Sequence, residues 1–397
     1  MKYKLYFLMI AIILIFIIGI FFLFNQTNNA TKNEWVKYFE DETHNEGYFV
    51  KATNDGGCIA LGYSKIQGKE DKDIFIIKTD KSGNTEWTEK YGNRGIDYAK
   101  ALVKTNDGYV IAGTSNSSKD SFFDFDLLLI KIDFNGSIIW QYTHGGSKLE
   151  EVNSIIQNKN GNFIITGSTT SYSQKGNNLW IAEVDINGEN MLWNKSYGGN
   201  DYDEGRSIIE SEDGYIIAGL TKSYSENSEY SDAWLLKTNM LGNEIWNYTF
   251  GFDYYDLFNQ IIEIDDGFLM VGHSSENKDE AGINKWNGFI VKTDENGLEQ
   301  WNITIKKDSD VGISSVVKND KDYVLVGYEK VNDIDNLYIL KIDEYGNIIY
   351  SETTNQDYKN AGIWIDKTID SYYYIVGYSD KNNDDVYELC LYKKLIE

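Results

Sequence analysis

A pattern of about 50 residues occurs seven times between Trp35 and Glu397, and this repetition constrains the fold more than any single residue does. Its clearest marker is an aromatic residue that recurs at spacings of 52, 53, 53, 53, 55 and 49 residues, as Trp35, Trp87, Trp140, Trp193, Trp246, Trp301 and Tyr350. A glycine recurs in every repeat, as Gly62, Gly113, Gly167, Gly219, Gly272, Gly327 and Gly377. The period predicts similar structural units that stack side by side.

The residues between these markers predict four strands in each repeat. An Asp-Gly or Asn-Gly pair, the strongest short signal for a hairpin, separates the first two strands in five repeats, at Asp55, Asp107, Asn160, Asp213 and Asp266. A D-x-x-G turn precedes the fourth strand, starting at Asp80, Asp133, Asp185, Asp294 and Asp343. We therefore predict an all-β fold, a seven-bladed β-propeller of four-stranded antiparallel blades.

The two ends of the repeat region predict how the ring closes. The last repeat stops after its third strand, Leu389 to Lys393, whereas the first β-type run, from Glu34, is an isolated fourth strand. We expect this N-terminal strand to complete the last blade. Such pairing removes the exposed strand edges of an open array.

The first 33 residues predict a membrane anchor. Lys2 and Lys4 precede an apolar stretch from Leu5 to Phe24, which as a helix of roughly 30 Å is long enough to cross a bilayer. No A-x-A cleavage site follows, which favours an uncleaved signal-anchor over a removed signal peptide. The expected organisation is a cytoplasmic N-terminus over 1–4, a single transmembrane signal-anchor over 5–24, a polar linker over 25–33 and the propeller over 34–397. The two lysines place the propeller on the extracytoplasmic side of the cell membrane.

Charge narrows the choice of partners. The chain carries a net charge of −25, and residues 25–397 alone hold 35 basic and 62 acidic side chains, a net charge of −27. Such a surface repels nucleic acid, so we expect no nucleic-acid partner. It attracts cations or basic partners instead.

The two cysteines lie in repeats that the predicted closure makes neighbours. Cys58 falls on a second strand of the first repeat and Cys390 on the third strand of the last. One alternative is a disulfide across the seam; the other is two buried thiols. Packed sheets lie about 10 Å apart and a disulfide needs Cα atoms within about 7 Å, so the sequence favours the thiols.

The loops indicate which face binds partners. The links from the second to the third strand are long, polar and unlike one another, as in 115–125, 169–177, 221–231 and 274–286. Variable loops on a rigid scaffold commonly carry binding residues, so this face is the candidate binding surface. The alternative is that these loops are merely tolerated insertions.

An acidic column marks the start of each innermost strand. The column reads Asn45, Asp97, Glu150, Asp203, Asp256, Asp310 and Asn360. Its five carboxylates, Asp97, Glu150, Asp203, Asp256 and Asp310, are the candidate metal site, since a ring of them suits Ca²⁺ or a basic side chain. The alternative, which we favour, is that each one bonds to the backbone of its own loop.

No motif predicts catalysis. The only histidines, His44, His144 and His273, form no metal or catalytic element, and we expect each of them in a loop. We assign no catalytic or cofactor-binding residue and expect no cofactor apart from the calcium alternative. Loop tyrosines such as Tyr172, Tyr224 and Tyr230 have rings suited to stacking on sugars.

The repeat resembles a known group. The pattern D-G-[G]-Y-x-x-A-G followed by K-x-D-x-x-G-x-x-x-W resembles tandem-repeat β-propeller proteins of bacterial and archaeal cell surfaces, and Asp80 to Trp87 is similar to the quinoprotein-type repeat. The resemblance covers nearly all of residues 34–397. It implies either a scaffold for the cell envelope or a pyrroloquinoline quinone dehydrogenase, although the chain lacks the adjacent cysteine pair of many such dehydrogenases.

Three functions follow from these observations. The first is a membrane-anchored binding or scaffold module that contacts an envelope protein or a glycan through its long-loop face. The second is a carbohydrate-active or quinone-dependent enzyme. The third is a purely structural component of the cell surface, and fold analogy alone does not choose among them.

Overall fold

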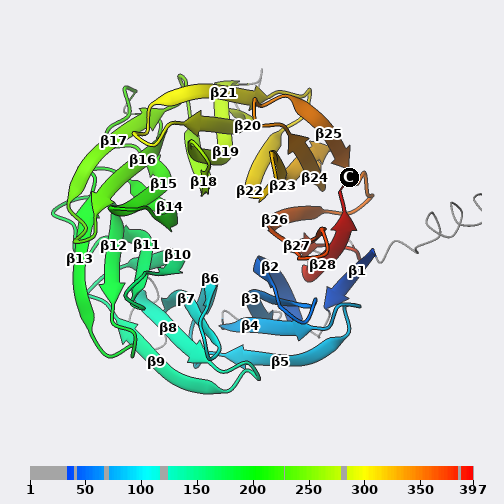
Figure 1. Cartoon of the computed structure of the whole chain (residues 1–397), viewed down its shortest axis with the longest axis horizontal. Coiled ribbons are helices and arrows are strands. Elements are labelled where there is room, and N and C mark those ends of the chain that lie inside the picture. The colour runs from blue at the N-terminus through cyan, green and yellow to red at the C-terminus, as the bar shows by residue number, and fades with distance from the viewer. Residues whose placement is uncertain are drawn as a thin grey trace, which may run out of the picture. The chain divides into compact units, whose positions relative to one another are not determined.

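The computed structural model describes residues 34–39, 43–66, 71–116, 124–227, 229–278, 284–382 and 386–396. The unit Trp35–Ile396 is a ring of seven four-stranded antiparallel sheets around a central channel (Figure 1). This arrangement is the predicted seven-bladed propeller. We number the blades along the chain: blade 1 is β2–β5, blade 2 is β6–β9, blade 3 is β10–β13, blade 4 is β14–β17, blade 5 is β18–β21, blade 6 is β22–β25, and blade 7 is β26–β28 with β1.

Each blade runs from an innermost strand at the channel to an outermost strand at the rim. The innermost strands are β2 (Thr43–Ala52), β6 (Asp97–Lys104), β10 (Glu150–Gln157), β14 (Asp203–Glu210), β18 (Asp256–Ile264), β22 (Val311–Asn319) and β26 (Asn360–Lys367). The second strands are β3 (Cys58–Ile66), β7 (Tyr109–Ser115), β11 (Phe163–Thr169), β15 (Gly214–Thr221), β19 (Gly267–Lys278), β23 (Asp322–Val331) and β27 (Tyr372–Ser379). The third strands are β4 (Lys72–Thr79), β8 (Asp126–Ile132), β12 (Asn178–Val184), β16 (Asp232–Asn239), β20 (Asn284–Thr293), β24 (Ile334–Ile342) and β28 (Glu388–Leu395). The outermost strands are β5 (Thr85–Tyr91), β9 (Ile138–His144), β13 (Met191–Tyr197), β17 (Glu244–Phe250), β21 (Glu299–Ile305), β25 (Ile348–Thr353) and β1 (Trp35–Phe39).

The second and third strands form the core, because both faces of each are covered by neighbouring blades. In β7 and β8, for example, every residue is buried. Such strands read as continuous apolar runs rather than as alternating patterns, since neither face meets water. The outermost strands alternate between exposed and partly buried residues, as in β9.

The recurring tryptophan connects the blades that carry it to the following blade. A Cβ added to Gly188 would lie 2.6 Å from the ring of Trp140, and one added to Gly297 would lie 2.6 Å from Trp246. Each of these glycines ends the D-x-x-G turn of the following blade and has a positive φ. The tryptophan therefore packs flat against a turn that has no side chain at this point.

The strand β1 pairs with β28 in antiparallel register. Trp35 lies opposite Lys393 and Phe39 opposite Leu389. The ring of Trp35 packs against the turn glycine of blade 1, where a Cβ on Gly83 would lie 2.9 Å from it. The strand β1 thus repeats the contact that Trp140 makes from β9 and Trp246 makes from β17.

The two cysteines are buried free thiols. Cys58 lies on β3 and Cys390 on β28, and burial raises the pKa of each thiol to about 12. Of the two alternatives that the sequence left open, the structure contains the unbridged pair.

Within the described residues no helix is long and apolar enough to span a membrane. The predicted signal-anchor, 5–24, and the linker, 25–33, lie outside these residues.

Candidate functional site

Every innermost strand contains a β-bulge at the same position. The register with the second strand shifts between Ala99 and Ala101 in blade 2 and between Gly205 and Ser207 in blade 4, and the same shift occurs in the other five blades. A bulge inserts one residue that has no partner on the neighbouring strand and re-aims its side chain.

The recurring glycine of the second strand accommodates this bulge. Gly113 pairs with Ala99, immediately before the bulge, and a Cβ on Gly113 would lie 2.2 Å from the carbonyl oxygen of Tyr98. In blade 3 the corresponding distance, from Gly167 to the carbonyl oxygen of Glu151, is 1.8 Å. Any larger residue would collide with the backbone, so the glycine that marks each repeat is required by the close approach of two strands.

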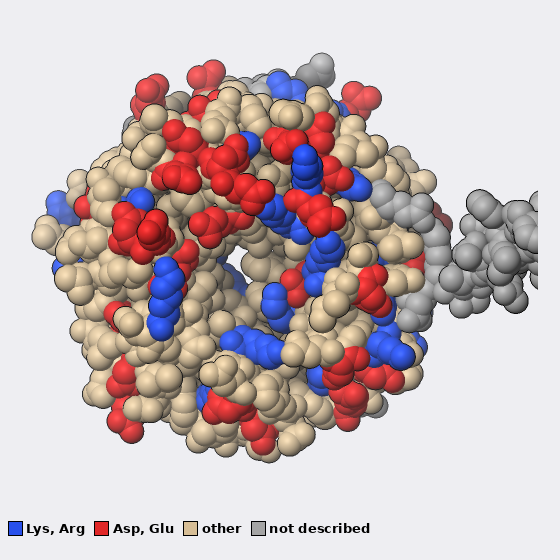
Figure 2. All heavy atoms as spheres, in the orientation of Figure 1, with Lys and Arg blue, Asp and Glu red and all other residues tan. Residues whose placement is uncertain are grey.

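The inserted residues form a ring at the channel, which we call the bulge ring. All seven side chains are partly exposed, whereas the residue before each of them is buried. The ring consists of Tyr48, Lys100, Asn153, Arg206, Asn259, Ser314 and Ile363. All seven line one cavity of about 410 Å³, the mouth pocket, together with Glu204, His273, Tyr328, Ala361, Trp364 and Tyr378. Figure 2 shows the opening at the centre of the ring, with Lys and Arg side chains on its edge.

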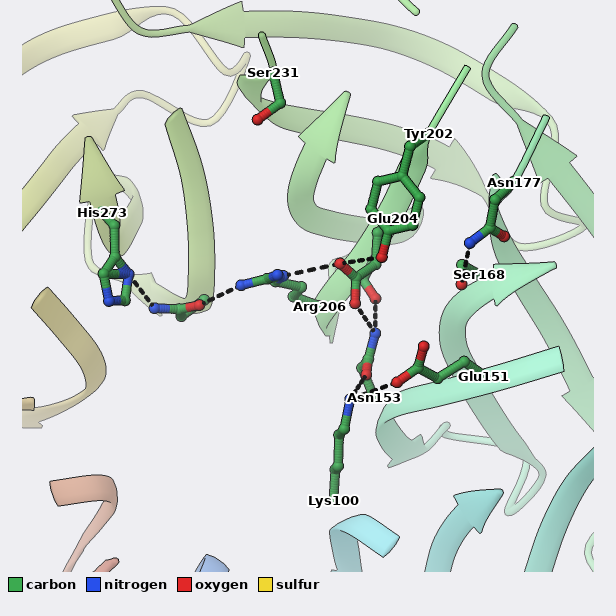
Figure 3. A network of polar contacts seen from close by, with 12 residues as sticks. Lys100, Glu151, Asn153, Ser168, Asn177, Tyr202, Glu204, Arg206, Ser231 and His273 are labelled. Carbon is green, nitrogen blue, oxygen red and sulfur yellow. Dashed lines mark hydrogen bonds and ion pairs between the residues drawn. The ribbon is translucent and has the colours of Figure 1, made fainter. Parts of the chain in front are cut away.

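The bulge ring carries a continuous network of polar contacts across four blades (Figure 3). We call it the polar arc; it comprises Lys100, Glu151, Asn153, Glu204, Arg206, Asn259 and His273. It begins in blade 2, where the Lys100 ammonium donates to Glu151 Oε1 at 2.7 Å and to Asn153 Oδ1 at 2.8 Å. Asn153 Nδ2 then donates to Glu204 Oε1 at 2.7 Å and to the carbonyl of Gly205 at 3.0 Å. The arc therefore joins blade 2 to blade 4 through side chains alone.

An ion pair lies at the centre of the arc. Arg206 Nε donates to Glu204 Oε2 at 3.1 Å, and Tyr202 donates to the same oxygen at 3.0 Å. Burial opposes ionisation of Glu204, but the charges of Arg206 and Lys100 outweigh it and lower the pKa of this carboxyl. Burial also opposes the charge of Arg206, and Glu204 in turn raises the pKa of the guanidinium. Both groups are therefore ionised at neutral pH.

The arc ends at a neutral histidine. Arg206 Nη1 donates to Asn259 Oδ1 at 2.8 Å, and since arginine has only donors, this contact orients the amide. Asn259 Nδ2 then donates to His273 Nδ1 at 2.9 Å and to the carbonyl of Ile313 at 2.8 Å. Burial and the nearby Arg206 charge lower the pKa of His273 to about 3. The imidazole is therefore neutral and carries its proton on Nε2.

The rest of the bulge ring is less polar. We call Tyr48, Ile363 and Trp364 the apolar wall; they come from blades 1 and 7, on the opposite side of the mouth pocket from Arg206. The Trp364 ring packs against Phe49 with centroids 4.8 Å apart, which holds it in place. The mouth pocket thus has one charged side and one aromatic side.

The structure places most of the acidic column as expected but does not bring its members together. Asp97, Glu150, Asp203 and Asp256 are buried, and each begins an innermost strand. Each accepts the backbone N–H of the residue four positions earlier, at 2.9, 2.6, 3.0 and 2.7 Å respectively. Each carboxylate therefore orders the loop that leads into its own blade.

In blade 6 the predicted member of this column, Asp310, is wrong by one residue. Val311 holds the position opposite Glu329, and Asp310 precedes the strand. Asp310 instead accepts the N–H of Trp286 at 3.1 Å and pairs with Lys330 at 3.4 Å. Asn45 and Asn360 keep their places in the column. Among the described residues no group of three or more His, Cys, Asp or Glu side chains is placed to hold a metal ion.

The histidines were predicted in loops, and this was wrong. His44, His144 and His273 lie on β2, β9 and β19. His44 accepts the Tyr387 N–H at Nδ1, at 3.2 Å, and its Nε2 lies 2.9 Å from Glu46. All three rings are partly buried on strands, because an aromatic side chain with polar edges suits a position between the core and solvent.

The loop tyrosines serve different purposes. Tyr172 stacks on Trp180 with centroids 5.7 Å apart, and its hydroxyl lies 3.0 Å from His144 Nε2. Tyr230 packs against Tyr254 and Tyr255. Tyr224, which is 49% exposed, remains open to solvent on much of its ring.

The bulge ring was not identified from the sequence, although its seven residues recur at the same spacing as the marker residues.

No protein-family model matches the sequence, and no curated protein matches it. Solved structures similar to this chain include the polysaccharide lyase Uly1 (TM-score 0.53, 8% identity, 88% of this chain and 90% of that chain). Sqt1 of Chaetomium thermophilum (0.50, 9%, 91% and 98%) and the β-propeller domain of the trilobed protease from Pyrococcus furiosus (0.50, 9%, 90% and 96%) are similar too. At these identities the likeness shows the fold alone. The chain is therefore a seven-bladed β-propeller.

Proposed function

We propose that this protein is a membrane-anchored binding or scaffold module that holds an envelope protein or glycan at its long-loop face. One observation carries the proposal: the mouth pocket lies toward the end of the channel where the innermost strands begin, and each of the seven blades contributes a bulge-ring side chain to it, of six residue types in all. A rigid scaffold with varied side chains in one concave place is typical of ligand recognition.

The alternative of an enzyme receives no residue-level support. The histidine of the mouth pocket is neutral, with Nδ1 engaged by Asn259, and the carboxylate of Glu204 already accepts from Asn153, Tyr202 and Arg206. Neither group is placed as a general base or nucleophile toward the pocket. The remaining alternative, a purely structural component of the cell surface, is distinguished from the binding module by the capture experiment that follows.

Capture from the native cell envelope tests the binding function. The bait is the full chain with a C-terminal affinity tag, and the matched control is a variant whose loops 171–176 and 222–230 are replaced by tight turns. We expect the wild-type chain to retain a specific component that the variant loses. Equal capture by both proteins, with both folded, would contradict recognition at this face and favour a structural role.

Localisation has its own test. In the proposed topology, residues 1–4 are cytoplasmic, 5–24 span the membrane and the propeller is outside. A membrane-impermeant amine reagent added to intact cells then labels propeller lysines as strongly as it does in lysed cells. Labelling that requires lysis would contradict this topology.

We further propose that β1 closes the ring as a functional part of the scaffold. Its pairing with β28 and the contact of Trp35 with the blade 1 turn support this role. Deleting residues 34–40 exposes the edge of β28, so we expect a drastically lower melting temperature. An unchanged melting temperature would contradict this role.

Calcium remains the cation to test at the acidic column. The backbone contacts of the four carboxylates favour a purely structural role for them. A ligand that binds only the folded state raises the melting temperature. Equal melting temperatures in millimolar Ca²⁺ and in chelator would remove calcium from consideration.

A further inference from the structure

Several polar groups of the mouth pocket have capacity left for a ligand. Arg206 uses Nε and Nη1 in the polar arc, which leaves three of its five N–H donors for a ligand. Lys100 uses two of its three donors. Across the pocket, the hydroxyls of Ser314 and Tyr328 have no hydrogen-bond partner among the described residues. Donors and hydroxyls distributed around one pocket suit a ligand with several oxygen atoms.

The unused charged donors of the lining favour an anion. Lys100 and Arg206 are each paired with a carboxylate, Glu151 and Glu204, so what favours a negative group is the remaining N–H donors of the two cations and not a net positive charge. Glu204 is 4% exposed and already accepts three hydrogen bonds, so it offers little to a cation. The chain as a whole carries −25. The remaining donors of these two cations can therefore make charge-assisted hydrogen bonds to a negative group in an otherwise acidic protein.

The opposite side of the pocket offers a surface for carbon atoms. The apolar wall consists of Tyr48, Ile363 and Trp364, and the Trp364 ring is held by Phe49. Aromatic rings pack well against the C–H face of a cyclic ligand. A volume of about 410 Å³ accommodates one such ring with room for water.

We propose that the mouth pocket binds a carboxylate-bearing sugar, a hexuronate unit of a glycan. Its carboxylate lies at the guanidinium of Arg206 and near Lys100, its hydroxyls face Ser314 and Tyr328, and its C–H face lies on Trp364. The proposal rests on the proposed function of the long-loop face, and it names the chemical class of the ligand.

Three small probes separate the contributions of the carboxylate, the hydroxyls and the ring of the ligand to binding. Methyl β-glucuronide carries ring, hydroxyls and carboxylate; methyl β-glucoside lacks the carboxylate; cyclohexanecarboxylate lacks the hydroxyls. Titration of the full chain by NMR or calorimetry is expected to show binding of the glucuronide at least tenfold tighter than binding of either other probe, since charge-assisted contacts and hydroxyl contacts are both needed. Raising the salt from 50 to 500 mM should weaken this binding severalfold.

Two variants connect the binding to the residues. Arg206→Gln should abolish detectable glucuronide binding while leaving the weak glucoside response unchanged. Because Arg206 also belongs to the polar arc, Ser314→Val serves as the second variant: it breaks no hydrogen bond of the described residues, and it should weaken glucuronide binding at least threefold with an unchanged melting temperature.

The outcomes separate this inference from the proposed function. Equal binding of glucuronide and glucoside would contradict the proposed role of the ligand carboxylate. Binding of none of the three probes would contradict the proposal that the pocket binds a sugar. If envelope capture still depends on the long loops in either case, the binding module stands and only its ligand class is wrong. If capture also fails, the proposed function is wrong as well.

Discussion

The two ends of the innermost strands follow opposite rules. At the end away from the mouth pocket, six blades repeat one contact between a lysine of the third strand and an aspartate near the first hairpin turn. The lysines are Lys78, Lys131, Lys237, Lys292, Lys341 and Lys393, paired with Asp55, Asp107, Asp213, Asp266, Asp322 and Asp370. At the bulge ring the backbone repeats seven times but the side chain differs in nearly every blade.

This difference separates the residues that build the blade from the residues that give it a function. A repeated pair of opposite charge satisfies the same buried groups in the same way in each unit. A position that keeps its backbone geometry and varies its side chain is not required by the blade. The hairpin end therefore stabilises the fold, whereas the bulge ring is free to vary, as the proposed binding function requires.

Blade 3 contains an instructive exception at the hairpin end. Glu183 replaces the lysine, and it accepts from Asn158 Nδ2 at 3.0 Å, from Asn162 Nδ2 at 2.7 Å and from Trp193 Nε1 at 2.5 Å. The charge is reversed, and amide and indole donors replace the carboxylate. The position thus requires a satisfied buried charge and not lysine as such.

Of the predictions on the hairpin end and the bulge ring, the largest loss of stability is expected when Glu183 is replaced. Glu183→Lys places an ammonium against three donors, so we expect a loss of about 2–4 kcal/mol in the free energy of unfolding. Chemical denaturation measures it. Adding Asn160→Asp rebuilds the pair of the other blades and should recover about half of the loss. A double variant as unstable as the single one would contradict the interpretation that the pair is the unit of stability.

Breaking one ordinary pair should cost less. Lys237→Met keeps the packed stem and removes an ammonium that lies 2.9 Å from Asp213, whose side chain is 61% exposed. Water solvates the remaining carboxylate, so we expect a loss of about 1 kcal/mol. Glucuronide binding should not change, because the pair is at the opposite end of the strands from the mouth pocket.

The hairpin-end pairs should also make the stability of the protein depend on pH in the acidic range. Burial opposes ionisation of Asp55, but hydrogen bonds from Lys78, Thr53 and the Gly57 N–H lower its pKa to about 2. The unfolded carboxyl has a pKa of about 3.9. Between pH 4 and 2 the unfolded state therefore binds the proton more readily, and stability falls as the pH falls. In Asp55→Asn the melting temperature should decrease less steeply over this window; an identical slope would contradict the shift.

The smallest stability effect is expected at the bulge ring. Ser314→Ala removes a hydroxyl that has no partner among the described residues, so the free energy of unfolding should change by less than about 0.5 kcal/mol. Thermal melting checks this. A loss above about 1 kcal/mol would show that the ring builds the fold as much as the hairpin end does.

The sequence predicts most of the scaffold because local chemistry repeats. The hairpin pairs, the D-x-x-G turns and the recurring Gly113 and Trp140 positions each report a local geometric requirement, such as a positive φ or the close approach of two strands. Repetition then averages out the ambiguity of any single repeat. It did not prevent the misplacement of Asp310, because the spacing of blade 6 differs from that of its neighbours.

The candidate site was not predictable in the same way. Lys100, Asn153, Arg206 and Asn259 lie 53 residues apart and look like scattered polar residues in the sequence. Only the bulge in each innermost strand turns them toward the same cavity, and only the ring brings four blades into hydrogen-bond contact. Contacts at a separation of one repeat leave no local signal.

The sequence by itself thus determined the number of blades, the strands and turns of each blade and the acidic character of the chain, because these depend on neighbouring residues and on composition. The tertiary structure alone decided that Arg206 donates to Asn259 of the next blade, that His273 is neutral, and that a charged side faces an aromatic side across one pocket. These properties depend on burial and on distances across blades, which exist only once the ring has formed.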